Sequence, residues 1–391
     1  MIPVNEPLLD GNEQKYLAEC ISSGWISSEG PFVERFEAEM AARTGRNFAV
    51  AVTSGTAALE LALASLRLEP GSLVALPTFC IISCAAAVIR NGCIPLFVDA
   101  DPLTWNMDVE KLAELLEDEI VRKNNRKLKA IMAVHTYGLP VDMGPLLSLA
   151  DRYGLKVVED AAEMHGQNYQ GKACGSFGAL SIFSFYPNKL VTTGEGGMVL
   201  TDDPLLAERC RSLRNLCFQP ERRFVHEELG YNFRMSNLQA AVGVAQLERL
   251  DRFIIRKRNM GSRYDTLLAG CAALQLPLAR SDFADNIYWV YGVVLGDEVA
   301  TDAAGMMRRL ASRGIGTRPF FWPMHEQPVF QRTGMLPENS GNFPVAERLA
   351  RRGFYLPSGL GLRDDQIDTV ASALLDELCT AQLPFPGKVT V

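Results

Sequence analysis

Residues 48–66 read FAVAVTSGTAALELALASL, and this stretch predicts the fold class of the protein. Phe48–Val52 is a short apolar run of strand length, and Ala57–Leu66 has the composition of a buried helix. Between them, Ser54-Gly55-Thr56 is a turn that offers a helix N-cap. Because this order of strand and helix recurs to about residue 200, the sequence predicts an α/β fold with a largely parallel sheet covered by helices.

Four more apolar runs in this region end at residues that carry chemistry or stop a strand. In parallel sheets, ligands bind just beyond the C-terminal ends of the strands. The residues at these ends are therefore the first candidates for a functional site. The runs are Leu73–Leu76 before Pro77, Ile94–Val98 before Asp99, Ala130–Val134 before His135, and Leu155–Val158 before Glu159-Asp160.

The chain has 391 residues, which is too long for one ordinary hydrophobic core. We expect a large domain over residues 1–250, which includes an N-terminal segment, and a smaller C-terminal α+β domain over residues 251–391. An amphipathic helix is predicted from Ser236 to about Asn259, near this boundary. The patterns in the second domain predict a strand over Ile287–Leu295 and helices over Asp302–Arg313, Phe343–Arg351 and Asp364–Leu378.

The composition narrows the class of protein. Hydrophobic residues make up 48% of the chain and charged residues 22%, a balance typical of soluble globular proteins. The net charge of −7 argues against a nucleic-acid surface, and an anionic substrate would need a local pocket of cations or backbone amides. No apolar run is long enough to span a bilayer, and the N-terminus lacks a signal-peptide pattern. Nine scattered cysteines without a CxxC pair favour reduced thiols over disulfides or a zinc site, so we expect a cytoplasmic protein without a metal.

Two strand ends carry groups that suit a charged cofactor. Ser54-Gly55-Thr56 suits a phosphate, because backbone N–H groups are free at a helix N-terminus and glycine permits close approach. A plain N-cap is the alternative role of this triplet. Asp160 ends an apolar strand, where a carboxylate is partly buried and needs a partner such as a protonated pyridine nitrogen. For Asp160, too, a helix N-cap is the alternative.

Lys189 follows the aromatic run Phe183–Asn188 and precedes the Gly-rich turn Thr192–Gly197. These surroundings should hold the lysine against the sheet, where desolvation favours the neutral amine that forms Schiff bases. A surface loop lysine is the alternative. Phe79, at another strand end, offers a flat ring for stacking on a pyridine, or else a core side chain. Together the four features predict a pyridoxal 5′-phosphate (PLP) site with Lys189 as the Schiff-base residue.

Several longer motifs occur in one order along nearly the whole chain. They are Gly24–Gly30, Thr53–Leu59, Val134–Gly138, Val158–Gly166, the Lys189 segment with Thr192–Gly197, and Gly230–Ala241. With these motifs the chain resembles the DegT/DnrJ/EryC1/StrS sugar aminotransferases. The resemblance implies the PLP-dependent transferase fold type I, which is similar to that of aspartate aminotransferase. It also implies a transaminase in which PLP alternates with pyridoxamine phosphate.

The resemblance implies a role for each matching residue. Lys189 would form the Schiff base and move the proton, and Asp160 would pair with the pyridine nitrogen. Glu163 would contact the ring hydroxyl, where the family more often has Gln. Asn232 would reach the phosphate from the neighbouring subunit, which implies a homodimer with shared active sites. The other implied cofactor contacts are Phe79 on the ring and Ser54, Gly55, Thr56 and Ser184 at the phosphate.

A narrower resemblance concerns the substrate. Gly314–His325 and Asn286–Trp289 are similar to the branch of the family that aminates the C4 ketone of GDP-4-keto-6-deoxy-D-mannose to GDP-perosamine, with L-glutamate as donor. This implies a nucleotide-sugar substrate, with GDP favoured as the nucleotide. The residues that we expect to contact the substrate are Trp25, Ser27, Tyr186, Arg318 and His325.

Other functions are weighed against this prediction. A UDP- or dTDP-linked keto sugar is the alternative substrate. A non-catalytic PLP-binding regulator is the alternative from another class, although the sequence has no DNA-binding extension or basic patch. A dehydratase of the same family would have His in place of Lys189, and a Rossmann dehydrogenase would have GxGxxG after the first strand.

Overall fold

A seven-stranded sheet forms the centre of the protein in a computed structural model, which describes residues 1–219, 221–334, 336 and 341–382. In spatial order its strands are β1 (Phe48–Val52), β9 (Gly197–Thr201), β8 (Leu180–Ser184), β5 (Lys156–Asp160), β4 (Leu128–Val134), β2 (Leu73–Pro77) and β3 (Ile94–Val98). β9 is antiparallel to both of its neighbours, and the other neighbouring pairs are parallel. The predicted α/β fold with a mostly parallel sheet is therefore confirmed.

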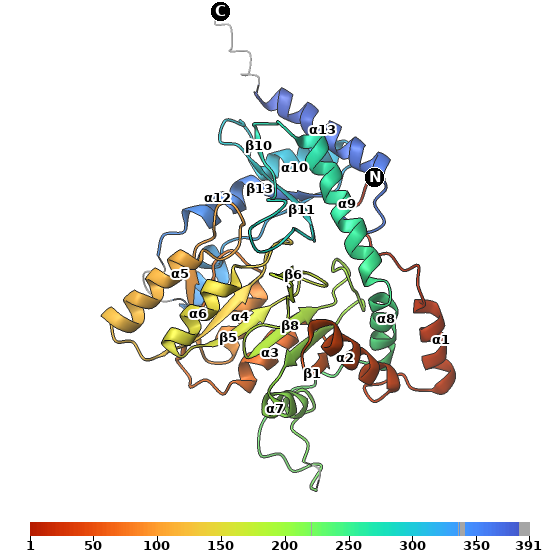
Figure 1. Cartoon of the computed structure of the whole chain (residues 1–391), viewed down its shortest axis with the longest axis vertical. Coiled ribbons are helices and arrows are strands. Elements are labelled where there is room, and N and C mark those ends of the chain that lie inside the picture. The colour runs from red at the N-terminus through yellow and green to blue at the C-terminus, as the bar shows by residue number, and fades with distance from the viewer. Residues whose placement is uncertain (220, 335, 337–340, 383–391) are drawn as a thin grey trace, which may run out of the picture.

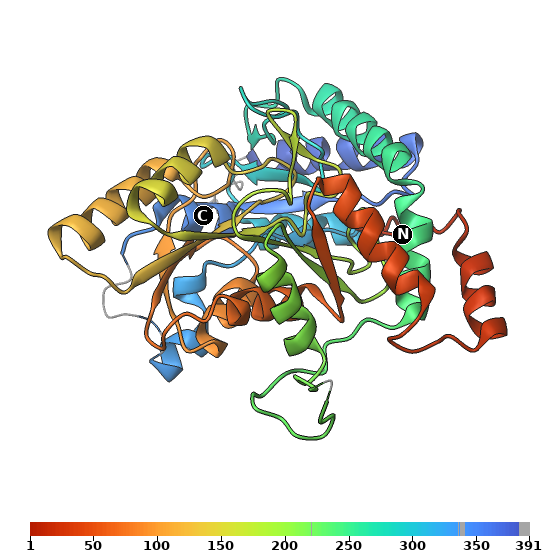
Figure 2. The ribbon, with the colours of Figure 1, turned by 60° about the horizontal axis from the view of Figure 1, so that its bottom comes forward.

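Helices lie on both sides of this sheet (Figure 2). In the N-terminal part they are α1 (Glu13–Ser23), α2 (Pro31–Thr44), α3 (Gly55–Ser65), α4 (Ile82–Arg90), α5 (Val109–Leu116), the π-helix η1 (Glu117–Arg122), α6 (Met143–Tyr153) and α7 (Pro204–Arg214). The apolar side chains of α3 are buried against β8 and β9, as its composition predicts. None of the helices in the described ranges combines the length and apolar character needed to cross a membrane.

A second, four-stranded antiparallel sheet has its own hydrophobic core. Figure 1 shows it at one end of the molecule, beside the N-terminus. The division of the chain into domains at residue 250 stays a prediction. The elements of this part are β10 (Leu274–Gln275), β11 (Tyr291–Leu295), α10 (Ala303–Ser312), β12 (Arg318–Pro319), the 3₁₀ helix η2 (Met324–Glu326), α11 (Pro328–Thr333), α12 (Pro344–Arg352), β13 (Gly353–Leu356) and α13 (Asp364–Gln382); a small hairpin, β6 (Asn168–Tyr169) and β7 (Lys172–Ala173), completes the fold.

The single helix predicted over Ser236–Asn259 is wrong in extent. The structure has two helices, α8 (Asn237–Leu247) and α9 (Leu250–Leu268), which meet at Glu248-Arg249. Figure 1 shows the change of direction between them. Because of this break, α8 packs against α1 and α2 near the large sheet, whereas α9 packs against α13 near the small one.

The strand predicted over Ile287–Leu295 is shorter than expected and begins at Tyr291. Tyr288 has a φ of 51°, which an extended strand does not allow. The irregular backbone at residues 286–290 brings Trp289 to the boundary between the two sheets, where it lines a cavity.

Candidate active site

A cavity of about 440 Å³ opens between the two sheets, and we call it the active-site cavity. It lies at the C-terminal ends of β4, β5 and β8, the edge of the sheet at which the sequence predicts ligand binding. The side of the small sheet contributes Trp289, Arg318 and Tyr355. Most of the residues predicted to contact the cofactor line this cavity, namely Ser54, Gly55, Thr56, Asp160, Glu163, Ser184 and Lys189.

The N-terminus of α3 forms one end of the active-site cavity. Ser54 is the N-cap, since its Oγ accepts a hydrogen bond from the N–H of Ala57 at 3.1 Å. Gly55 and Thr56 follow in the first turn, where backbone N–H groups have no partner within a helix. A Cβ on Gly55 would lie 2.7 Å from the Cβ of Ser184, so only glycine permits this approach of α3 to β8. Backbone donors beside hydroxyl groups at a helix N-terminus suit a phosphate.

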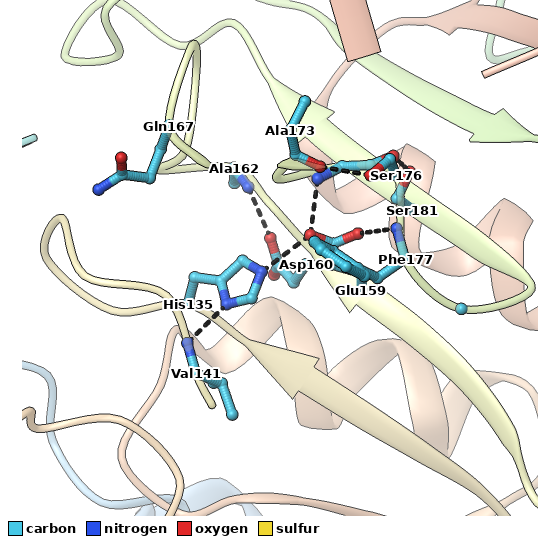
Figure 3. A network of polar contacts seen from close by, with 12 residues as sticks. His135, Val141, Glu159, Asp160, Ala162, Gln167, Ala173, Ser176, Phe177 and Ser181 are labelled. Carbon is cyan, nitrogen blue, oxygen red and sulfur yellow. Dashed lines mark hydrogen bonds and ion pairs between the residues drawn. The ribbon is translucent and has the colours of Figure 1, made fainter. Parts of the chain in front are cut away.

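Asp160 is the last residue of β5 and is 2% exposed. Its Oδ1 accepts a hydrogen bond from the N–H of Ala162 at 3.0 Å (Figure 3), and its Oδ2 accepts one from the thiol of Cys84 at 3.3 Å. Neither partner carries a positive charge, and burial raises the pKa of Asp160. A protonated nitrogen placed against this carboxylate would stabilise its charged form. The position therefore fits the predicted contact with a pyridine nitrogen.

A buried histidine fixes the edge of the sheet beside Asp160 (Figure 3). The Nε2 of His135 lies 2.9 Å from Oε1 of Glu159, and its Nδ1 accepts a hydrogen bond from the N–H of Val141 at 3.0 Å. The proton therefore sits on Nε2 and is donated to Glu159. The same carboxylate accepts the backbone N–H groups of Gly175 and Phe177 at 2.6 and 2.8 Å. This network holds the ends of β4 and β5 at the cavity wall.

Lys189 lies on the loop that connects β8 to β9 along the chain. Its side chain is only 11% exposed, so it is not the surface lysine of the alternative interpretation. Its Nζ is 3.5 Å from Oε1 of Glu163 and 4.0 Å from the ring centre of Trp289. Trp289 is held in place because its indole N–H donates to the carbonyl of Asn188 at 2.8 Å. The amine is thus set between an acid and an aromatic ring at the cavity wall.

Glu163 follows β5 and is almost completely buried, at 6% exposure. Its Oε2 accepts a hydrogen bond from the N–H of Tyr137 at 2.7 Å. Burial raises the pKa of Glu163 to about 7, although the positive charge of Lys189 opposes this effect. Near neutral pH this carboxyl group therefore exists in both protonation states.

The predicted substrate contacts divide into two groups. Tyr186 and Arg318 line the active-site cavity and are exposed to solvent. Trp25 and Ser27 are exposed residues outside its wall. Their backbone carbonyls accept hydrogen bonds from the side-chain amide and the backbone N–H of Asn237, at 2.8 and 2.6 Å. This anchors the N-terminal segment to α8, and the role of both residues toward a substrate stays a prediction.

His325, Phe79 and Asn232 also lie outside the wall of the cavity. The Nδ1 of His325 is 2.8 Å from Oγ1 of Thr78. Phe79 is fully buried in an aromatic cluster, with its ring centre 5.9 Å from that of Tyr137. Asn232 is exposed on the segment that follows α7. The functional roles of these three residues stay predictions.

The cavity is also lined by residues to which the sequence assigned no individual role, among them His135, Tyr137, Trp289 and Tyr355. Tyr137 has a φ of 61°, and its hydroxyl accepts the N–H of Phe321 at 2.9 Å. The motif Val134–Gly138 is the signal that marks the first two. Trp289 belongs to the motif Asn286–Trp289, which the narrower resemblance assigns to the substrate, whereas nothing local in the sequence joins Tyr355 to a lysine at 189.

The polar groups of the cavity match the polar parts of PLP. The α3 N-terminus with Ser184 suits the phosphate, the buried Asp160 suits the ring nitrogen, and the amine of Lys189 suits the aldehyde. Fold and cavity together define a PLP-dependent transferase of fold type I.

Comparisons with known proteins give the family. The model of the DegT/DnrJ/EryC1/StrS aminotransferase family matches residues 7–375. The chain is 39% identical over 377 residues to GDP-perosamine synthase from Vibrio cholerae, covering 96% of this chain and 98% of that protein. It is 37% identical over 348 residues to dTDP-3-amino-3,4,6-trideoxy-alpha-D-glucose transaminase from Streptomyces venezuelae, covering 88% and 86%. The crystal structure of the aminotransferase TlmJ from Streptoalloteichus hindustanus matches with a TM-score of 0.88 at 30% identity, covering 98% of this chain and 100% of that one.

The chain belongs to the DegT/DnrJ/EryC1/StrS aminotransferase family. The membership confirms the resemblance stated from the motifs, and it confirms PLP as the cofactor.

Proposed function

We propose that the protein transfers the amino group of L-glutamate to the C4 ketone of GDP-4-keto-6-deoxy-D-mannose and so forms GDP-perosamine. The name and the near full-length similarity of the V. cholerae relative support this substrate. The observation that carries the reaction type is the buried amine of Lys189 in a cavity that also holds Asp160.

Lys189 is the residue that moves the proton. When PLP is bound, its ring stores the electron pair left on a substrate carbon that has lost a proton. The amine of Lys189 removes the proton from the amino donor and later returns one to C4 of the sugar. Because the amine acts from one side of the active-site cavity, it also determines the configuration of the new amino group. Its low exposure supports this role, since solvent has little access to it.

The other residues predicted to contact the cofactor would bind PLP and polarise its ring. Asp160 would keep the ring nitrogen protonated, which would let the ring accept electrons. Glu163 would contact the ring hydroxyl, and Phe79, the predicted stacking residue, would support the ring from the aromatic cluster outside the cavity wall. Gly55, Thr56 and Ser184 would hold the phosphate at the helix that Ser54 caps.

The protein acts as a homodimer in which each active site uses residues of both subunits. The segment between α7 and α8 projects from the body of the molecule (Figures 1 and 2) and exposes Phe224 at 81% and Leu229 at 92%. Apolar side chains on such a segment support a protein interface. Asn232, at the end of the segment, would reach the phosphate site of the partner. The sugar nucleotide would contact Trp25, Ser27, Tyr186, Arg318 and His325.

A dTDP-linked keto sugar is the second candidate substrate, and the S. venezuelae relative supports it. We assign the reaction to the cytoplasm, and the nine cysteines, all of them free, support a reducing compartment.

The test supplies the purified protein with PLP, L-glutamate and one keto sugar at a time, linked to GDP, dTDP or UDP, and identifies the product by mass spectrometry. We expect an amino sugar to form fastest from the GDP-linked ketone. Faster conversion of the dTDP- or UDP-linked ketone would change the proposed substrate. If no glutamate is consumed with any of the three, the result would point to a PLP-binding regulator.

A further inference from the structure

A buried acid lies against the reactive amine. Oε1 of Glu163 is 3.5 Å from Nζ of Lys189, and both side chains are almost closed to solvent. The other oxygen, Oε2, is held by the N–H of Tyr137 at 2.7 Å. This hydrogen bond fixes the carboxyl group with Oε1 toward the lysine. The two groups are therefore placed to exchange a proton without solvent.

We propose that Glu163 is a catalytic residue that accepts a proton from the Lys189 ammonium group and leaves a neutral amine in the resting site. One N–H bond of Lys189 breaks with its electron pair kept on Nζ, one O–H bond forms at Oε1, and nothing is oxidised or reduced. The pair changes from two ions to two neutral groups, which burial favours because both ions are poorly hydrated there. The neutral amine is the form that attacks a carbonyl carbon or removes a proton. The proposal rests on the proposed function, since it needs Lys189 as the reacting amine.

The charges around Glu163 support proton exchange near neutral pH. Lys189 opposes the rise of the pKa of Glu163, whereas the like charge of Asp160 adds to it, and the balance with burial gives about 7. The phenols of Tyr137 and Tyr355 also face the acid. Burial raises the pKa of both phenols, to about 12 for Tyr355, so they remain neutral at pH 7.

The remaining cation of the wall, Arg318, is engaged elsewhere. Its guanidinium group interacts with the hydroxyl of Tyr355, on the side of the small sheet. His135 is neutral in its network with Glu159, because one of its ring nitrogens accepts a hydrogen bond. Among the described residues of the cavity wall, Glu163 and Lys189 thus form the one pair of an acid and an amine within 4 Å of each other.

The substitution Glu163→Gln tests this role directly, because glutamine has nearly the same shape and cannot take the proton. The apoprotein is mixed with PLP, and the bonding of PLP to Lys189 is followed by its visible absorbance between about pH 6.5 and 9. We expect the wild-type rate to change little above pH 7, since the proton moves within the pair. In the variant the proton must leave to solvent, so the rate should be lower at pH 7 and rise about tenfold per pH unit.

Three controls make the result specific. The rate of PLP with N-acetyl-lysine corrects for the ionisation of PLP itself. Glu208→Gln, on the exposed side of α7, should keep the wild-type profile. Glu163→Asp keeps an acid farther from Nζ, so it should keep the flat profile with a lower rate.

Two outcomes would overturn the inference. The first is a Glu163→Gln rate that matches or exceeds the wild-type rate near pH 7, which would mean that Glu163 only holds Lys189 as an ion. The second is a steep rise of the wild-type rate itself, a result that does not depend on whether the variant folds. If PLP fails to bond to the wild-type protein at all, the proposed function fails, and this result is distinct from both.

Discussion

The two sides of the active-site cavity differ in the solvent exposure of their polar residues and in the number of contacts that these residues make within the chain. On the side of the large sheet, Asp160, Glu163 and Lys189 are 2–11% exposed and each is fixed by named contacts. On the open side of the cavity, Tyr186 and Arg318 are exposed to solvent, Tyr186 at 45%. Most buried polar groups form hydrogen bonds within the fold, whereas exposed polar groups remain free to bind a ligand or a second subunit. Contacts within one chain therefore fix the buried groups, whereas the exposed groups have room for the substrate and, under the proposed function, for the partner subunit.

The largest effect should come from the buried side, with Lys189→Ala. Loss of the amine removes the group that moves the proton, so we expect turnover to fall by about three orders of magnitude or more. PLP should still bind without a covalent bond, because the phosphate and nitrogen contacts remain. Turnover is measured with glutamate and the keto sugar, and Lys129→Ala on the exposed part of β4 is the control. A Lys189→Ala enzyme with normal turnover would remove the basis of the comparison.

Asp160→Asn should lower turnover by about a hundredfold. The amide can still accept the N–H of Ala162, so the fold should remain, but it cannot stabilise a charged ring nitrogen. We expect PLP to bond to Lys189 normally while the amino-donor half of the reaction slows. Stopped-flow measurement of that half-reaction decides the point, and an unchanged rate would show that Asp160 only caps the turn to Ala162.

On the open side, Arg318→Ala should raise KM for the sugar nucleotide about ten- to a hundredfold and change kcat less, because a charged hydrogen bond to an anionic substrate is lost. Steady-state kinetics with the sugar nucleotide varied would measure this, with Arg308→Ala on α10 as the control. An effect on kcat alone would mean that Arg318 takes part in the chemical step and not in substrate binding. The two sides of the cavity would then not differ in function as described.

The smallest effect concerns the stability of the large sheet, away from the wall of the active-site cavity. His165 is buried between Phe183 and Phe185, and among the described residues neither of its ring nitrogens has a hydrogen-bond partner. Burial lowers its pKa to about 3, so the unfolded chain binds a proton below about pH 6.5 and the folded protein does not. The free energy of unfolding should therefore decrease as the pH is lowered from about 6.5 toward 3. His165→Leu should reduce the loss between pH 7 and 5 by about 1–2 kcal/mol in urea unfolding; equal losses in both proteins would contradict this.

The cavity residues that could be predicted from the sequence differ from the others in the origin of their position, which is either local sequence or the packing of the two sheets. Asp160 and Lys189 are predictable because each stands at a strand end beside apolar sequence, and a charge in that setting needs a reason. Tyr355 reaches the cavity only through the packing of the small sheet on the large one, and the same packing places Trp289 beside Lys189, which the motif Asn286–Trp289 does not indicate. The fold class follows from the alternation of strands and helices, whereas the break at Glu248-Arg249 depends on two separate packing partners.

If Lys189 and the buried groups around it perform transamination, the half-reaction with the amino donor should proceed without any sugar. The protein with PLP bound is mixed with L-glutamate in the absence of any sugar, and the visible absorbance and the 2-oxoglutarate formed are followed together. We expect the absorbance to fall while about one 2-oxoglutarate forms per bound PLP. A visible absorbance that stays unchanged, with no 2-oxoglutarate, in a protein whose PLP is bonded to Lys189 would contradict it.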